Sequence, residues 1–440
     1  MLDVFPSPIE EELKLLAPFL ISFLVFLAMG VPVAFAMGGA ALAYAFLSSG
    51  ISPTLLVQTT FAGMASFPLL AIPLFILAGN LMNEGGITDD LVNFSRQLVG
   101  HIPGGLGLTT IVACAIFASI SGSAVATAVA IGTVMLPAMR RAGYDDETSS
   151  ALTATASCVG PIIPPSIPFI IYGVLAQVSI GALFIAGIIP GLLLGLCLMI
   201  YMVVVARRRG YPREPRAPIG SILAGTVRAL PSLAMPVIIL GGIWGGIFTP
   251  TEAAGIAVVY AFIVGFPVYR RLKLNRLFAL FLKSGVESSV VMLLLGLSEP
   301  FAWVVAVEQV PLKAMDALAS LSSSPLVFLA LANVFLLLVG IALETAPALT
   351  IVTPILVPLA ERMGIDPVHF GVIVCFNLVL GLITPPVGGV LFSVCGITGL
   401  SLERLSRGIW IPFLIAVAVL MAVTFVPALS TFLPRLLLSH

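Results

Sequence analysis

Long apolar stretches, separated by short polar ones, make up most of the chain. A membrane-spanning helix needs about 20 apolar residues. Ten stretches come close to or exceed that length, near residues 13–29, 30–49, 67–83, 147–177, 183–206, 229–247, 251–269, 284–307, 367–395 and 409–433. The pattern predicts an all-α polytopic membrane protein with about ten transmembrane segments.

Two further apolar regions, 105–139 and 326–359, are each interrupted near the middle by polar residues. Each arm is then only about 15 to 18 residues long, which is short for a crossing. We therefore predict two re-entrant helical hairpins, with tips at Ser121-Gly122-Ser123 and Glu344-Thr345-Ala346. The alternative is one tilted, kinked span in each place, but the same break in both regions favours the hairpins.

The two halves of the chain also match at a fixed spacing. Pro137 corresponds to Pro358 (358 − 137 = 221), Gly160 to Gly381, and the proline pair that begins at Pro164 to the pair that begins at Pro385. Paired apolar segments interrupted by Gly and Pro are typical of the inverted repeats of secondary transporters, and they mark the central binding site. The spacing therefore predicts a carrier.

The positive-inside rule orients the predicted segments. If the basic loop 207–216 is cytoplasmic, all but four of the 20 Lys and Arg residues lie inside or at the inner boundary, and the two hairpins open to opposite sides. We thus predict a first inverted repeat over 1–206, a cytoplasmic linker over 207–228 and a second repeat over 229–440. The scaffold helices, hairpin and broken helix are predicted near 13–49, 105–139 and 147–177 in the first repeat, and near 229–269, 326–359 and 367–395 in the second.

Composition agrees with a protein that contacts membrane lipid. Hydrophobic residues make up 60% of the chain, charged residues 9%, and the mean hydropathy is +1.18, whereas soluble domains carry about 25% charged residues. The 20 basic and 20 acidic residues balance, which gives no reason to expect a nucleic-acid partner. The five cysteines and three histidines have no ligand spacing, and there is no P-loop sequence.

The breaks carry the candidate chemistry. Prolines interrupt helical hydrogen bonding, and the carbonyl groups that they free are ligands suited to sodium when they line a cavity. The predicted sodium ligands are Ser121, Gly122, Ser123, Gly160, Pro164, Ser166, Glu344, Thr345, Gly381, Thr384, Pro385 and Gly388. The predicted substrate contacts are Ser123, Pro165, Ser166, Thr345, Ala346 and Pro386. The alternative is that the prolines are packing kinks and the hydroxyls bond back to their own helices.

Other polar residues are better explained as helix caps. Thr249, Pro250 and Glu252 have the spacing of a capping box with a first-turn proline, and capping explains Glu252 more simply than proton coupling does. Asp145 and Asp366 each precede a new helix and are expected to cap it.

Four phrases resemble the large membrane subunit of tripartite ATP-independent periplasmic (TRAP) transporters. They are Ile72–Gly79 (IPLFILAG), Gly160–Ser166 (GPIIPPS), Phe248–Ala253 (FTPTEA) and Ile383–Gly388 (ITPPVG), and the resemblance covers nearly the whole chain. It implies an elevator-type ion-transporter fold in the bacterial inner membrane and sodium-driven uptake of an organic acid. It also implies two partners: a periplasmic substrate-binding protein and a separate small four-helix membrane subunit.

Other classes of protein stay open. A stand-alone sodium/dicarboxylate or citrate carrier of the related ion-transporter group would share the hairpins but need no binding protein. A channel would also be polytopic, although alternating access needs no continuous pore. An enzyme is the least favoured class, because no catalytic constellation lies at membrane depth. The substrate is not specified: sialic acid, a C4-dicarboxylate and another sugar acid fit equally well.

Overall fold

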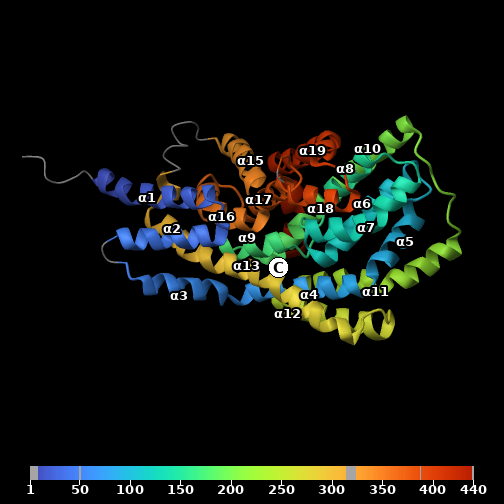
Figure 1. The fold of residues 1–440 in the computed structure, drawn as a ribbon, viewed down its shortest axis with the longest axis horizontal. Coiled ribbons are helices and arrows are strands. Elements are labelled where there is room, and N and C mark those ends of the chain that lie inside the picture. Colours follow the sequence, from blue (N-terminus) through green and yellow to red (C-terminus); the bar gives the residue numbers. More distant parts are fainter. Residues whose placement is uncertain (1–7, 49–50, 314–323, 387, 439–440) are drawn as a thin grey trace, which may run out of the picture.

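The computed structural model describes residues 8–48, 51–313, 324–386 and 388–438, and its regular secondary structure is helical throughout these ranges (Figure 1). The helices of the first half are α1 (Pro8–Ala28), α2 (Val33–Leu47), α3 (Pro53–Met64), η1 (Phe67–Leu70), α4 (Ala71–Glu84), α5 (Ile87–Val99), α6 (Gly105–Ser121), α7 (Ala124–Arg141), α8 (Asp146–Ser157), α9 (Ile167–Leu175) and α10 (Ile180–Arg209). Those of the second half are α11 (Ile219–Trp244), α12 (Pro250–Ile263), η2 (Val264–Val268), α13 (Leu274–Val307), α15 (Pro325–Ala342), α16 (Thr345–Arg362), α17 (Pro367–Gly381), α18 (Gly389–Thr398), α19 (Leu402–Phe425) and α20 (Ala428–Leu438).

Within the described residues, seven helical segments are long and apolar enough to cross a membrane, among them α10, α13 and α19. Shorter apolar helices such as α6 and α17 lie between them. The predicted class, an all-helical polytopic membrane protein, is confirmed.

Helix boundaries recur at the spacing found in the sequence. Helices α7 and α16 begin at residues 124 and 345 and end at 141 and 362, so both boundaries differ by 221. Helices α8 and α17 begin at 146 and 367, which is the same difference. The division into two inverted repeats is not tested by these boundaries and stays a prediction.

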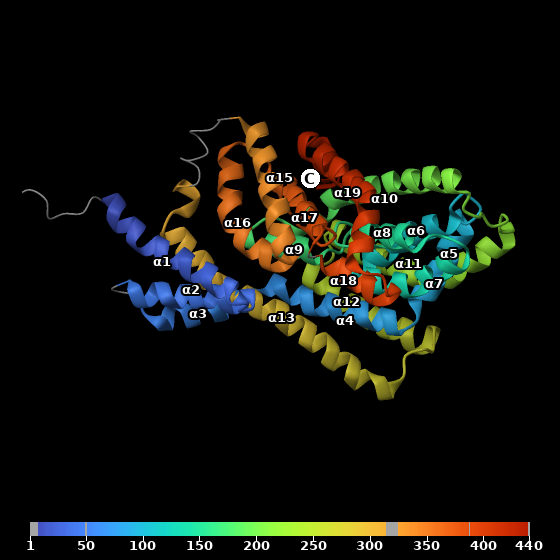
Figure 2. The ribbon, with the colours of Figure 1, turned by 45° about the horizontal axis from the view of Figure 1, so that its top comes forward.

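Each interrupted apolar region forms a helical hairpin. Helices α6 and α7 pack against each other, as do α15 and α16, and the chain turns at residues 122–123 and 343–344. Figure 2 places α15 and α16 on one side of α17 and α18, and α6 and α7 on the other. The predicted broken helices are α8 with α9 and α17 with α18.

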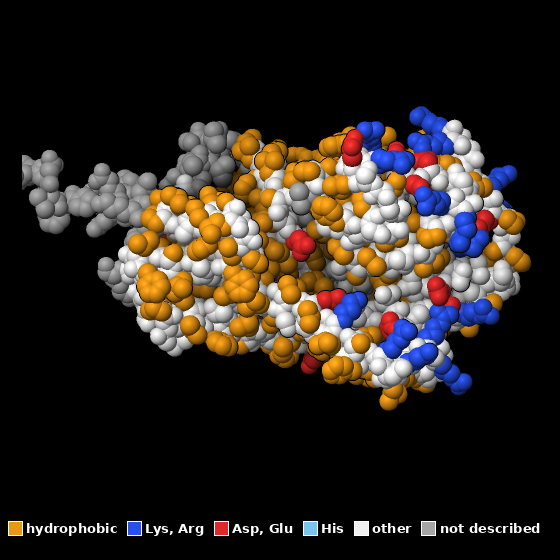
Figure 3. All heavy atoms as spheres, viewed as in Figure 1, with side chains coloured by type: hydrophobic (Ala, Val, Ile, Leu, Met, Phe, Trp, Pro, Cys, Tyr) orange, Lys and Arg blue, Asp and Glu red, His pale blue; other side chains and the backbone are white. Residues whose placement is uncertain are grey.

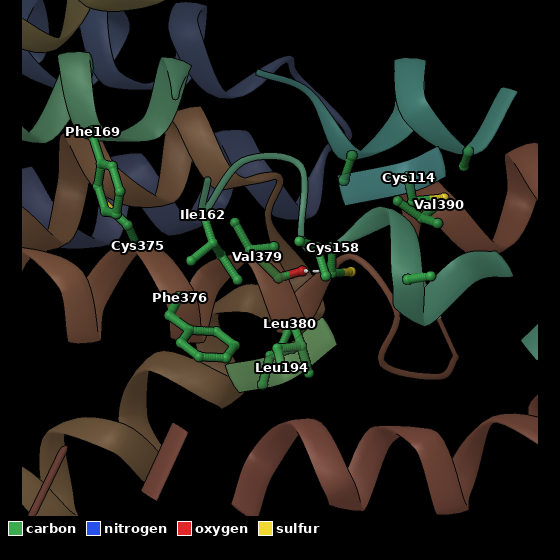
Figure 4. Packing of buried hydrophobic residues seen from close by; sticks show 14 of the residues in the cluster. Cys114, Cys158, Ile162, Phe169, Leu194, Cys375, Phe376, Val379, Leu380 and Val390 are labelled. Carbon is green, nitrogen blue, oxygen red and sulfur yellow. Dashed lines mark hydrogen bonds between the residues drawn. The ribbon is translucent and has the colours of Figure 1, made fainter. Parts of the chain in front are cut away.

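Buried apolar residues form two clusters. The smaller cluster joins α1, α2, α3 and α13 around Phe19, Tyr44 and Phe301. The larger cluster takes in both hairpins, both broken helices, α10 and α19, and it also includes α4, α5 and the predicted scaffold helices α11 and α12. Figure 4 shows its centre, where Phe376 and Leu380 of α17 lie beside Leu194 of α10. The helices α1 and α2 therefore have a core apart from that of the hairpins.

The predicted caps are confirmed. The carboxylate of Asp145 accepts a hydrogen bond from the Thr148 amide at 3.0 Å, and that of Asp366 accepts from the Val368 and His369 amides. Thr249 and Glu252 form a reciprocal capping box at the start of α12. Because these side chains satisfy amides that helix starts leave unpaired, they fix where the helices begin.

Some predicted boundaries differ from the structure. Helices α10 and α11 extend into the predicted linker 207–228 from both sides, so only residues 210–218 lie outside helices. The predicted span 409–433 is divided between α19 and α20 at Val426 and Pro427, since Pro427 cannot continue the hydrogen bonding of α19. The predicted scaffold stretch 13–49 contains α2 and most of α1, with residue 49 outside the described part.

Candidate substrate and cation site

The first hairpin tip is a tight turn rich in oxygen atoms. Gly122 has φ +61°, a left-handed conformation that favours glycine. Ser123 then caps α7 by accepting a hydrogen bond from the Ala126 amide at 3.3 Å. The hydroxyls of Ser121 and Thr127 lie 3.0 Å apart, and Thr127 donates to the Ser123 carbonyl at 2.7 Å.

The first break, residues 158–166, is a buried irregular segment between α8 and α9. Its last residue, Ser166, is fully buried. The Ser166 hydroxyl donates to the Pro161 carbonyl at 2.5 Å and accepts from the Phe169 amide at 3.2 Å. Ser166 therefore holds the break in shape and caps α9 at the same time.

The first tip lies directly against the first break. A Cβ atom added to Gly122 would be 2.8 Å from the Pro165 carbonyl oxygen, and one added to Gly160 would be 3.1 Å from Oγ1 of Thr127 and 3.4 Å from the Ser123 carbonyl. Glycine is required at both positions because the backbones approach so closely. The structure thus brings together the predicted residues of the first repeat and adds Thr127, whose position four residues after Ser123 on α7 could have revealed it.

The second tip and break approach each other in a similar way. A Cβ atom on Gly381 would be 2.4 Å from the carbonyl oxygen of Gly340, the last turn of α15. Thr345 lies 3.5 Å from the Leu378 carbonyl, and Thr384 donates to the Leu380 carbonyl at 2.8 Å. The Thr384 oxygen keeps its lone pairs, since it acts only as a donor in this bond.

A cavity of about 180 Å³ lies beside the second tip. The residues that line it are Gly340, Ile341, Ala342, Leu343, Glu344, Gly381, Leu382, Gly389 and Phe392. None of these residues is basic, so an anion in this cavity would have to be held by backbone amides and helix N-termini. Glu344 caps α16 through its backbone alone and is exposed. Of these residues, sequence reasoning found Glu344 and Gly381 but missed Gly340 and Phe392, which carry no local signal.

The remaining predicted residues lie in the first break, in the second break and near the starts of α16 and α18. Pro164 and Pro165 are buried in the first break, whereas Pro386 is exposed and Pro385 is half-buried in the second. Gly388 lies under the start of α18, where a Cβ atom would be 2.4 Å from the Leu382 carbonyl. Ala346 instead packs against the apolar clusters, so the structure does not bring it to the cavity.

The two hairpins also meet the opposite broken helices. Helix α7 packs against α18, and α16 packs against α9. A Cβ atom on Gly389, at the start of α18, would lie within 4.0 Å of both Glu344 and Val125. Four helix N-termini, those of α7, α9, α16 and α18, therefore belong to one connected assembly of tips and breaks.

The fold defines the class of protein. The chain superposes on the YdaH transporter of Alcanivorax borkumensis with a TM-score of 0.62 at 14% identity, over 93% of this chain and 98% of that one. This likeness shows that the two chains share a helical fold. Over residues 20–429 the chain also matches the family described as tripartite ATP-independent periplasmic transporter, DctM component.

The chain belongs to this DctM family and is a large permease subunit of a TRAP transporter, in the inner membrane. It is 41% identical to the sialic acid TRAP transporter large permease SiaM of Vibrio cholerae, over 93% of this chain and 96% of that protein. The C4-dicarboxylate TRAP transporter large permease of Pseudomonas aeruginosa is 40% identical over 84% of this chain and 86% of that protein. The isethionate TRAP transporter permease DctMQ of Oleidesulfovibrio alaskensis is 41% identical over 93% of this chain, which spans 65% of that longer protein.

Proposed function

We propose that this subunit imports an organic acid together with sodium ions, by an elevator mechanism. The observation that carries the proposal is the pair of tip-and-break assemblies, one around Gly122 and Gly160 and one around Gly340 and Gly381. Each assembly combines irregular backbone with hydroxyl and carbonyl oxygens. Irregular backbone is tolerated at membrane depth where it is buried or lines a polar cavity.

The oxygens fit sodium, which is carried as a substrate. In the first assembly Ser121, Ser123 and Thr127 supply hydroxyls beside the Pro165 carbonyl. In the second, the Thr384 hydroxyl lies on the break three residues after Gly381, which lines the cavity. Hard monovalent cations take such neutral oxygen ligands at helix breaks of many carriers.

An organic acid fits the same assembly. Its carboxylate would face the N-termini of α9 and α18, where the helix dipole favours negative charge. Bound sodium would add positive charge that the cavity lining lacks. The relatives are named for sialic acid, isethionate, 2,3-diketo-L-gulonate and C4-dicarboxylates, all of which are organic acids.

Two observations support inverted repeats that move as an elevator. The Cys158 thiol contacts the carbonyl of Val379 at 3.8 Å, and these residues occupy equivalent positions, 221 apart (Figure 4). A residue that touches its own counterpart lies on a two-fold axis. In addition, α1 and α2 have a core separate from that of the hairpins. The hairpins and broken helices would move together against them.

We further propose that the chain works with a small four-helix membrane subunit and a periplasmic substrate-binding protein. Membership of the TRAP family supports both partners. The experiment is uptake of organic acids into liposomes that contain this chain with both partners, with one, or with neither. We expect uptake only with both partners and with sodium outside. Full uptake in choline would contradict sodium coupling, and sodium-driven uptake by this chain alone would assign it to the stand-alone carriers.

A further inference from the structure

A buried polar network joins three helices of the second half. Asn377 of α17 donates to the carbonyl oxygen of Asn333 at 3.0 Å and to its side-chain oxygen at 2.8 Å. Asn333 of α15 donates to Leu329 O at 2.8 Å and to the Thr424 hydroxyl of α19 at 3.2 Å. Asn333 is 1% exposed, and Asn377 and Thr424 are 0% exposed.

Burying this polar network costs free energy of folding. It is surrounded by the larger apolar cluster, and the side-chain oxygen of Asn377 has no hydrogen-bond partner among the described residues. A buried polar atom without a partner destabilises the folded state, and apolar residues of similar size would avoid the penalty. A structural role alone is therefore a poor reason for two asparagines at this depth.

The network lies close to the second tip and break. Asn377 is four residues before Gly381, and Asn333 is seven residues before Gly340, so each asparagine is one or two helical turns from the backbone contact between those glycines. Two contact points on the same pair of helices fix both their separation and their rotation. Beyond the glycines, the same helices lead directly to Glu344 and Thr384.

The equivalent positions of the first half lack asparagines. The positions 221 residues before Asn333 and Asn377 are Val112 and Ala156, which cannot form these hydrogen bonds. We propose that Asn333 and Asn377 are positioning residues that hold α15 against α17 and thereby set the sodium affinity of the second tip-and-break assembly. This inference rests on the proposed sodium coupling and adds that the two assemblies differ in how they are held.

The test is a sodium titration of the full chain, in the assembled transporter, with choline keeping ionic strength constant. Uptake gives the half-saturating sodium concentration, and thermal unfolding gives the stabilisation by sodium, which does not depend on transport. In Asn333→Ala and Asn377→Ala we expect half-saturation to rise about threefold to tenfold, the factor typical of interhelical hydrogen bonds in membranes. Because the two substitutions share the side-chain bond between Asn377 and Asn333, the rise in the double variant should be smaller than the product of the two single rises.

Two further variants sharpen the test. Thr424→Val keeps the volume and the bonds between Asn333 and Asn377, and it removes the bond from Asn333 to Thr424 together with that from Thr424 to the Leu420 carbonyl; it should give a smaller rise. Thr353→Val is the matched control, because the Thr353 hydroxyl is buried in α16 and has no hydrogen-bond partner in the described part of the chain, and it should leave half-saturation unchanged. Unchanged sodium dependence in all three network variants would overturn the positioning role. A wild-type protein that shows neither sodium-dependent uptake nor stabilisation by sodium would instead overturn the proposed function.

Discussion

Single hydroxyls at the first tip have separable roles. Ser166 bonds to Pro161 and Phe169 within the break, whereas Thr127 bridges the Ser123 carbonyl and the Ser121 hydroxyl beside Gly160. Thr127 is therefore a candidate sodium ligand in the first assembly, and Ser166 acts mainly on the shape of the break.

We predict that Thr127→Val raises the half-saturating sodium concentration for uptake about threefold to tenfold, the effect of one lost oxygen contact. Thr133→Val is the control, because Thr133 lies on the same helix and bonds only to the Ala130 carbonyl. A sodium titration of uptake checks the pair. Equal curves for Thr127→Val and wild type would exclude Thr127 from the site.

At Gly381 there is no room for a side chain. A Cβ atom would lie 2.4 Å from the Gly340 carbonyl oxygen, which belongs to rigid backbone. We expect Gly381→Ala to cost about 1–3 kcal/mol of stability and to abolish sodium-dependent uptake. Gly396→Ala, on exposed α18 surface with nothing within 4 Å, should be neutral or stabilise by about 0.5–1 kcal/mol. Thermal unfolding compares the two; equal stability would show that the crossing of α15 and α17 can relax.

Asp145 gives the protein a pH-dependent contribution to stability. Partial burial raises the pKa of its carboxyl, but hydrogen bonds from Thr148 and Arg209 outweigh burial and bring the pKa below its usual value. A lowered folded-state pKa means that the contribution is present above the unfolded pKa, about 3.9, and is lost as pH falls through the folded pKa.

Asp145→Asn should therefore lower the unfolding temperature by a similar amount from about pH 8 down to about pH 5, and the difference should shrink below about pH 4. Asparagine caps helices about as well as aspartate, so the cap itself is retained. Thermal unfolding of both proteins across this range is the measurement. If the difference in unfolding temperature between the two proteins grew at acidic pH, the lowered pKa of Asp145 would be contradicted.

Helix α16 contacts the helices of the smaller apolar cluster at α2 as well as at α13. The hydroxyl of Thr350 on α16 lies 3.8 Å from the sulfur of Met37 on α2, and Ile351 and Ile355 of α16 pack against the smaller cluster. If the hairpins move as a block, this contact must break during transport.

We predict that a short thiol crosslinker joining Met37→Cys to Thr350→Cys stops uptake and that reduction restores it. The control is Asn80→Cys with Ser284→Cys. In the native protein the side chains of Asn80 on α4 and Ser284 on α13 are joined by a hydrogen bond of 3.0 Å. Crosslinking the control should leave uptake largely intact. Normal transport with the α2–α16 crosslink complete would contradict the moving-block mechanism. Both pairs are introduced after the five native cysteines are replaced.

Charged side chains are distributed unevenly over the molecule. Figure 3 shows Lys and Arg side chains gathered at one end, over the region of α5, α10 and α11, while apolar side chains cover much of the opposite half. Arg207, Arg208 and Arg209, at the end of α10, are all exposed. By the positive-inside rule we expect the basic end to face the cytoplasm.

An impermeant maleimide applied to whole cells should therefore label Ser52→Cys, between α2 and α3, but not Arg208→Cys. Permeabilised cells should show labelling of both, because both positions are exposed. The native cysteines are buried or half-buried and should give little background. Labelling of Arg208→Cys alone in intact cells would reverse the orientation.

The sequence by itself determined the class of protein, the hairpin turns, the breaks and the caps. Each of these is encoded locally: Gly122 allows a left-handed turn, proline pairs end helices, and Asp145, Thr249 and Asp366 satisfy the amides of the helices that follow them. Apolar length alone identified most of the spans.

Only the tertiary structure decided which segments meet. The contact of Gly340 with Gly381, the approach of Thr127 to Gly160, the Asn333–Asn377 network and the separate cores all depend on residues far apart in sequence. A glycine or an asparagine in an apolar helix has the same local propensity whether or not a partner helix lies against it. Its function is set by which backbone or oxygen atom the fold brings within reach, and periodicity along a single chain does not contain that information.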